Sequence, residues 1–232
     1  MVAAKHLSRR AALALIGAGF VVPSVAATPL VDLALVLAID SSYSIDPEEY
    51  LQQMRGTGQA FLDSKIMEAI ARGPNKQIAV AAFLWSDAGH ENLIVPWRII
   101  AKPADAISVA DVFLSIPRED YKGSTGTGAA LLFAQKLLHE APPSLRRVVD
   151  LSTDGTRNTG PEVEPVRDRL VRDGITINGL AIANEVPDLQ TYITKSVIGG
   201  DGHFVIVARD YNAYTEAIKT KLLREVSNFD II

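Results

Sequence analysis

The chain has 232 residues, of which 48% are hydrophobic and 22% charged, a length and composition typical of one globular domain with a full core. Its formal net charge is -4 and the body of the chain has no basic cluster, so DNA or RNA is not expected as a partner. The absence of cysteine excludes disulfides, thiolate metal sites and a cysteine nucleophile.

The N-terminal segment has the organisation of a cleavable export signal. Basic residues precede an apolar run over 11–22, and small residues at 24–26 fit the site that a signal peptidase reads. The apolar run is too short to span a bilayer, so no stable membrane anchor is expected after cleavage. We expect a signal peptide over 1–26 and a domain over 27–232 that is periplasmic or secreted, exported from a bacterium by the general secretory or the twin-arginine route.

Strand-like and helix-like segments alternate along the rest of the chain. Strands are expected over 33–39, 77–84, 93–100, 147–151, 175–181 and 203–207, and helices over 47–64, 103–114, 127–140, 162–173, 188–194 and 211–226. The continuously apolar first strand is typical of a central parallel strand, whereas Pro96 favours an edge position for the third. The alternation predicts one α/β domain: a doubly wound, mostly parallel sheet with one antiparallel edge strand and helices on both faces.

The most informative motif is the Asp-x-Ser-x-Ser turn that follows the first strand. It places Asp40, Ser42 and Ser44 at alternate positions, so that a carboxylate and two hydroxyls can converge on one point. Oxygen ligands without sulfur or imidazole suit a hard cation such as Mg²⁺. Taken alone, the motif is equally consistent with side-chain hydrogen bonds that shape a turn. We expect Asp40 to be a solvated carboxylate at the strand end, outside the core.

Two further loops carry matching chemistry. The segment 122–128 combines glycines with hydroxyls ahead of an apolar helix, and the strand that follows ends in the run Ser152-Thr153-Asp154-Gly155. In doubly wound sheets, ligands bind at the carboxyl ends of the strands where the strand order reverses. The three loops are therefore expected to offer oxygen ligands at one end of the sheet. A phosphate-binding loop is disfavoured, because no Gly-Lys-Ser/Thr follows the glycines.

These three motifs, in this order, resemble the metal-ion-dependent adhesion site (MIDAS) of von Willebrand factor type A (VWA) domains. The resemblance extends over about 31–226 and is closest to bacterial exported single-domain VWA-like proteins of uncharacterised function. Carried over position by position, it implies five metal ligands from the three loops: Asp40, Ser42, Ser44, Thr125 and Asp154.

The resemblance also implies a function. The cofactor would be Mg²⁺, with Mn²⁺ or Ca²⁺ as alternatives, and the partner would be a protein that donates a carboxylate to the ion. Because three hydroxyls and few carboxylates satisfy Mg²⁺ incompletely, an added carboxylate should be favourable. The chain is therefore expected to be a metal-dependent interaction or adhesion module and not an enzyme. In the family, a change of ligand is coupled to movement of the last helix, which is expected here over 211–226.

Several alternatives stay open. In the second loop, Ser124 and Thr127 are also available, and Thr125 is chosen by the Gly-x-Thr-x-x-Gly spacing. A Mg²⁺-dependent hydrolase or phosphatase could use Asp40 and Asp154, although hydroxyls dominate the site and no nucleophilic aspartate with a nearby acid is evident. A structural periplasmic module with an empty site is a third hypothesis.

Three other side chains are assigned structural roles. Asp150 lies on an apolar strand and should point toward a neighbouring helix, which favours structural hydrogen bonds over metal binding. Trp85 and Trp97 flank the edge hairpin and are expected to be packing residues, while remaining the best aromatic candidates for a contact at the rim of the site.

Overall fold

A computed structural model describes residues 29–118, 123–184 and 186–227. In this part of the chain six strands form one sheet in the order β3-β2-β1-β4-β5-β6. The strands are β1 (Val31–Asp40), β2 (Ile78–Trp85), β3 (Glu91–Ile100), β4 (Ser144–Thr153), β5 (Thr176–Ile182) and β6 (Val205–Ala208). Neighbouring strands are parallel except β2 and β3, which are antiparallel. The predicted mostly parallel sheet with one antiparallel edge strand is confirmed.

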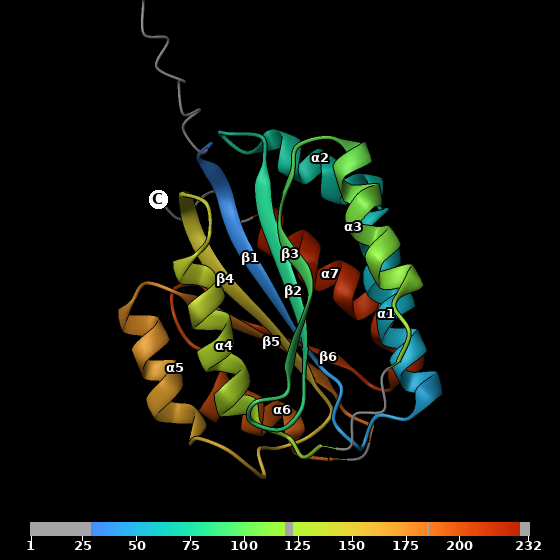
Figure 1. Cartoon of the computed structure of the whole chain (residues 1–232), viewed down its shortest axis with the longest axis vertical. Helices are drawn as coiled ribbons and strands as arrows, with labels where there is room; N and C mark the ends of the chain where they lie inside the picture. The colour runs from blue at the N-terminus through green and yellow to red at the C-terminus, as the bar shows by residue number, and fades with distance from the viewer. Residues whose placement is uncertain (1–28, 119–122, 185, 228–232) are drawn as a thin grey trace, which may run out of the picture.

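Helices cover both faces of this sheet, as Figure 1 shows. One face carries α1 (Pro47–Phe61), α2 (Ser64–Arg72), α3 (Pro103–Ser115) and α7 (Tyr214–Ser227). The other face carries α4 (Thr127–His139), α5 (Val163–Arg172) and α6 (Leu189–Tyr192). A π-helical turn (Ile193–Val197) continues α6, and a 3-10 turn (Tyr211–Ala213) precedes α7. The doubly wound architecture expected from the sequence is therefore present.

The two faces of β1 supply two separate hydrophobic cores. All ten residues of the strand are buried. Side chains alternate along a strand, so Leu33, Leu35 and Leu37 pack under α1 and α7, whereas Ala34 and Val36 pack under α4 and α5. A continuous apolar run was the expected signature of such a doubly covered strand.

The helical region after β1 differs from the prediction of a single helix over 47–64. The first helix starts as predicted, because the side chain of Asp46 accepts hydrogen bonds from two backbone N–H groups of its first turn. It ends at Phe61, and α2 begins at Ser64 after a second cap, in which Asp63 accepts from the backbone N–H of Lys65 at 2.9 Å. The helix α2 was not predicted.

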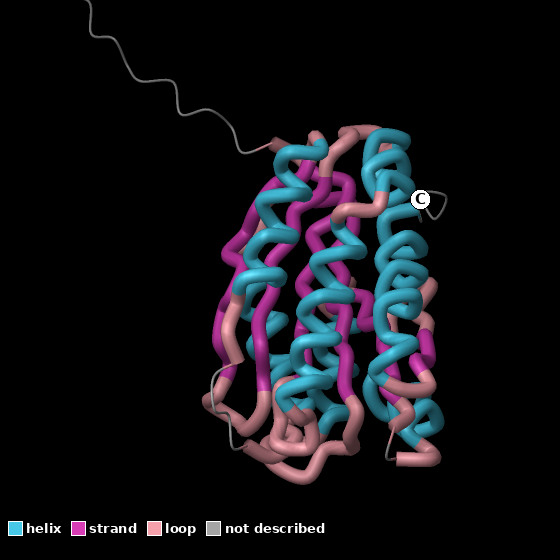
Figure 2. Tube along the Cα trace, turned by 90° about the vertical axis from the view of Figure 1, so that its right-hand side faces the viewer, coloured by secondary structure: helices cyan, strands magenta, loops and turns pink. Residues whose placement is uncertain are grey.

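The connections position the polar loops. The chain leaves β1 through α1 toward β2 on one side, and β4 pairs with β1 on the other side after α4 has crossed the opposite face. The strand order therefore reverses between β1 and β4, which creates a crevice at their carboxyl ends. Figure 2 shows the loops gathered at this carboxyl end of the sheet, at the bottom of the view.

No helix in the described part of the chain is long and apolar enough to cross a membrane. The proposed signal over 1–26 lies outside the described residues.

The start of α4 provides a test of the close packing around these loops. A Cβ atom at Gly128 would collide with the backbone oxygen of Pro161, which cannot move aside as a flexible side chain can. Gly128→Ala should therefore lower the free energy of unfolding by about 1 to 3 kcal/mol in urea denaturation, the collision outweighing the better helix propensity of alanine. The exposed Lys136→Ala on the same helix should change it by less than about 0.5 kcal/mol. Equal stabilities would contradict the packing.

Candidate metal site

The first loop begins with a carboxylate that is fully buried. Asp40 is the last residue of β1 and is 0% exposed. One of its oxygens accepts a hydrogen bond from the backbone N–H of Ser42 at 2.8 Å, and the other accepts from the hydroxyl of Thr153 at the end of β4. From α1, the side chain of Gln53 donates to the Asp40 backbone carbonyl at 3.2 Å. The expectation of a solvated carboxylate was wrong, because β4 and α1 enclose this strand end.

A chain of hydrogen bonds joins the first loop to the third. The hydroxyl oxygens of Ser42 and Ser44 lie 3.2 Å apart, and the Ser44 hydroxyl donates to Asp154 Oδ1 at 2.9 Å. The phenol of Tyr211, in the turn before α7, donates to the other Asp154 oxygen at 3.1 Å. Asp154 is 3% exposed, so its carboxylate is held inside the crevice by both neighbours.

The second loop contributes Thr125. Its side chain is 5% exposed, and its hydroxyl lies beside the third loop, 3.4 Å from the position that a Cβ atom would take at Gly155. Reciprocal hydrogen bonds with Asn158 fix its backbone: Thr125 N–H donates to Asn158 Oδ1 at 2.7 Å, and Asn158 N–H donates to the Thr125 carbonyl at 3.1 Å. Of the two alternatives, Ser124 is exposed, and Thr127 is buried in the first turn of α4.

The structure thus brings the five side chains inferred from the sequence to one place. Ser42, Ser44 and Thr125 line an open hollow of about 500 Å³, and Asp40 and Asp154 lie behind these hydroxyls. The described residues include no group of three or more His, Cys, Asp or Glu side chains that could hold a metal ion. Any cation bound here would depend on hydroxyl oxygens in addition to the two carboxylates.

The electrostatics favour an added positive charge. Burial, and after it the nearby Asp154 carboxylate, raise the pKa of Asp40 to about 7, against hydrogen bonds from Thr153 and Ser42 that lower it. A buried carboxylate beside another carboxylate is costly unless a cation or hydrogen bonds compensate for the lost hydration. Hard oxygen donors around two such groups fit Mg²⁺.

The site also contains two tyrosines that were not expected there from the sequence. Burial, assisted by Asp154, raises the pKa of Tyr211, so its phenol stays protonated and donates to Asp154. Tyr43 lies between the two serines of the first loop, lines the hollow and is 75% exposed. Its backbone N–H donates to the Gly123 carbonyl at 2.9 Å, which ties the first loop to the second.

The two tryptophans are packing residues, as expected. Trp85 is 1% exposed in the core under α4, so it is not available for contact at the rim of the hollow. The indole of Trp97 donates to the backbone carbonyl of Leu137 in α4 at 3.1 Å. The exposed aromatic side chain at the site is Tyr43 instead.

Comparison with solved structures identifies similar folds at low sequence identity. Proximal thread matrix protein 1 from the mussel byssus matches with a TM-score of 0.61 and 16% identity, over 84% of this chain and 46% of that chain. The pilus adhesin SpaC from Lactobacillus rhamnosus GG matches with a TM-score of 0.62 and 14% identity, over 86% and 30%. A von Willebrand factor type A protein from Catenulispora acidiphila matches with a TM-score of 0.57 and 16% identity, over 84% and 43%.

The chain spans less than half the length of each of these proteins, and identities this low establish the fold alone. One structure of the mussel protein is described as having a zinc occupied MIDAS motif. No curated protein matches the chain in sequence. Residues 30–230 match a family described as "Protein of unknown function (DUF1194)". The chain, with the fold of a VWA domain, therefore belongs to the DUF1194 family.

Proposed function

We propose that this protein is a metal-dependent binding module that holds a divalent cation at the crevice between β1 and β4 and uses it to capture an acidic side chain of a protein partner. The observation that carries the proposal is the convergence of three hydroxyls and two buried carboxylates on one open hollow. The proposed ligands are the five residues inferred from the sequence: Asp40, Ser42, Ser44, Thr125 and Asp154.

The composition of the site explains why a partner carboxylate is favourable. Mg²⁺, the ion that we propose, supplies a hard positive charge that prefers oxygen ligands in near-octahedral geometry. Ser42, Ser44 and Thr125 are neutral ligands, and the carboxylate that lines the hollow, Asp87, is not among the proposed ligands. Asp40 and Asp154 are buried behind them and are already engaged by hydrogen bonds. A carboxylate that arrives from solvent would add the charge that the hydroxyls lack.

The relatives support a binding function without specifying it. Among proteins of similar fold, one is a pilus adhesin and another is a thread matrix protein, for which a structure with a zinc occupied MIDAS motif exists. By analogy, we propose that the present site also takes a metal ion and serves adhesion or protein binding. Because fold similarity alone is a weak guide to function, the hydroxyls and carboxylates of this site are the main support for metal binding.

Tyr43 gives the proposed binding surface an aromatic contact. Its side chain is 75% exposed beside Ser42 and Ser44, whereas its backbone is fixed by the bond to Gly123. Exposed aromatic side chains on a rigid backbone are enriched among the residues that dominate protein interfaces. We propose that Tyr43 packs against the partner next to the captured carboxylate.

The metal ligands of the second loop can be tested by substitution. Thr125→Ala should weaken Mg²⁺ binding, measured by calorimetry on the folded protein, at least tenfold, because an oxygen atom that would contact the ion is lost. A tenfold change corresponds to about 1.4 kcal/mol. Ser124→Ala removes the adjacent exposed hydroxyl and should leave the affinity unchanged. If Ser124→Ala weakened binding and Thr125→Ala did not, the assigned ligand would be incorrect. If the parent bound no divalent ion, the proposed function would fail.

The role of Tyr43 separates partner binding from metal binding. After a partner has been isolated from envelope extract with Mg²⁺ and released with a chelator, Tyr43→Ala should weaken its binding by more than about 1 kcal/mol. The same substitution should not change Mg²⁺ affinity, because the Tyr43 side chain is not a proposed ligand. If every protein captured with Mg²⁺ stayed bound when the chelator was added, capture through the ion would be excluded. Turnover of a phosphate ester with Mg²⁺ would instead support the hydrolase alternative.

We further propose that the module works outside the cytoplasm after removal of residues 1–26. The basic, apolar and small-residue segments of the N-terminus support this location. N-terminal sequencing of exported protein should give a mature chain that begins at Ala27 or Thr28. Exported protein that retained Arg9 and Arg10 would show that the signal is not cleaved.

A further inference from the structure

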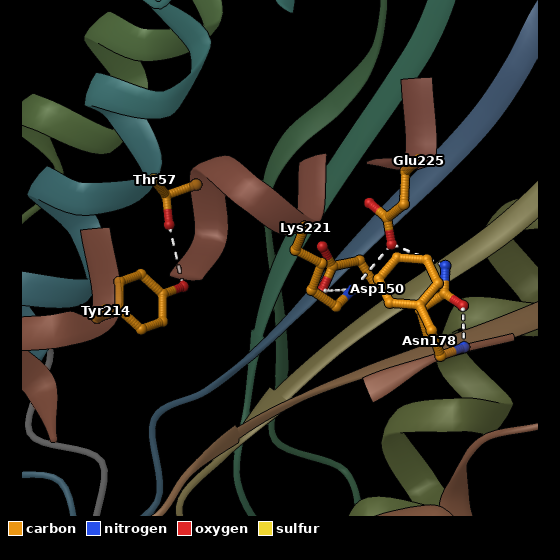
Figure 3. A network of polar contacts seen from close by, with 7 residues as sticks. Thr57, Asp150, Asn178, Tyr214, Lys221 and Glu225 are labelled. Carbon is orange, nitrogen blue, oxygen red and sulfur yellow. Dashed lines mark hydrogen bonds and ion pairs between the residues drawn. The ribbon is translucent and has the colours of Figure 1, made fainter. Parts of the chain in front are cut away.

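A buried lysine connects α7 to the centre of the sheet. The Lys221 side chain is 0% exposed, and its ammonium lies 2.6 Å from Asp150 Oδ1 on β4 and 2.8 Å from Glu225 Oε1, one turn further along α7. Figure 3 shows these three side chains together between the helix and the strand. The prediction that Asp150 has a structural role facing a helix is confirmed, and its partner on that helix is the charged ammonium of Lys221.

The charges of these three side chains do not cancel when all three are ionised. Two carboxylates and one ammonium leave a net charge of minus one in a place where Asp150 is 2% and Glu225 1% exposed. An uncompensated charge in the interior is strongly unfavourable. Within the described part of the chain, the second oxygens, Asp150 Oδ2 and Glu225 Oε2, have no hydrogen-bond partner. One proton on either carboxylate would remove the net charge.

The surroundings stabilise the charge on Glu225 more than on Asp150. The amide of Asn178 donates to Glu225 Oε1 at 2.9 Å, and the positive charge of Arg146 attracts the Glu225 carboxylate. Burial, and after it repulsion by Glu225, raise the pKa of Asp150 to about 7 against the opposing effect of Lys221. The proton is therefore best placed on Asp150.

Other charged or titratable groups lie around the cluster on several elements. Tyr214 and Arg224 are on α7, Asp32 is on β1 and interacts with Arg146 on β4, and Arg147 on β4 and Asp201 in the loop before β6 line the adjoining cavity. Burial raises the pKa of Tyr214, so this phenol stays neutral at physiological pH. Arg224 lies over the ring of Phe204, 3.9 Å from its centroid.

From this arrangement we propose that Asp150 and Glu225 share one proton in weakly acidic solution, and that loss of this proton as the pH rises weakens the attachment of α7 to β4. A cavity of about 210 Å³, lined by Arg146, Asn178 and Glu225 among others, lies next to the cluster at the end of the sheet opposite the candidate metal site. This cavity gives protons a short route from solvent to the cluster. The inference requires neither a metal ion nor a partner, so it stands independently of the proposed function.

The direction of the pH effect follows from proton binding. The folded-state pKa of Asp150, about 7, lies above its ordinary value of 3.8, so the folded protein holds one more proton than the unfolded chain between these limits. The stability that this proton provides is complete below about pH 4 and is lost as the pH rises through about 7. Between about pH 4 and about pH 7, the cluster should raise the equilibrium constant for unfolding by up to about tenfold for each unit by which the pH rises.

The test compares this dependence between variants of the full chain. Denaturant unfolding would be followed at several pH values from about 5 to about 8 with a chelator present, so that no metal ion contributes. Glu225→Gln and Asp150→Asn each leave one carboxylate opposite Lys221, a pair that is neutral without a proton. Both variants should lose the contribution of up to tenfold per pH unit that the parent shows. The matched control Glu216→Gln changes an 81% exposed carboxylate on the same helix and should keep the dependence of the parent.

A second measurement is spectroscopic and compares the parent with Asp150→Asn. The infrared difference spectrum between about pH 5 and about pH 8 should show a greater loss of the carbonyl stretch of buried protonated carboxyl groups in the parent than in Asp150→Asn, because the shared proton leaves in this range. Asp40, whose pKa is also raised to about 7, contributes equally to both proteins. The proposal is overturned if the two proteins show the same loss, or if both cluster variants fold and retain the pH dependence of the parent. Loss of the dependence in Glu216→Gln as well would show that it arises from surface charge.

Discussion

The burial of β1 on both faces is the constraint on which the rest of the structure depends. A strand without a solvent face needs a neighbour on each edge and helices above and below, and β2, β4, α1 and α4 meet these needs. Because the two neighbours are reached by connections on opposite faces, the end of β1 lies where the strand order reverses. The polar groups of the site lie at this end of β1, after the apolar run of residues 33–39. Asp40 can be fully buried there because Ser42 and Thr153 satisfy its oxygens.

Much of this fold could be predicted from the sequence because its signals are local. A continuous apolar run identifies a doubly covered strand, Pro96 marks an edge strand, and Asp46 with Pro47 marks the start of α1. The missed helix α2 also had a local signal, the cap at Asp63, which the apparent continuity of the preceding helix obscured. Strand ends were harder to predict: β4 begins at Ser144, three residues before the expected position, since pairing with β1 and not residue type sets that limit.

In the candidate site, too, some residues could be predicted from the sequence and others could not. The five proposed ligands could be named from the sequence because each belongs to a short loop motif: four follow or end β1 and β4, and Thr125 lies just before α4. Tyr211 was not found, since its contact with Asp154 joins positions 57 residues apart and no motif records it. Lys221 and Glu225 were missed for a different reason. Oppositely charged residues four apart on a helix normally indicate a solvated face. Their burial becomes apparent only when Asp150 on a covered strand is placed opposite them.

The segment from Tyr211 through α7 makes polar contacts along the length of β4. Near the carboxyl end of the strand, Tyr211 contacts Asp154, the residue that follows β4. Further back, Lys221 contacts Asp150, and Arg146 donates to the backbone carbonyl of Glu225. The end of α7 is thus attached to the strand by two polar contacts, whereas the turn before the helix is attached to the third loop by one hydrogen bond. If the hydrogen bond of Tyr211 opened while the other two contacts held, the start of the helix could swing away from the strand about its fixed end. Translation of the whole helix along β4 would require all three contacts to break together.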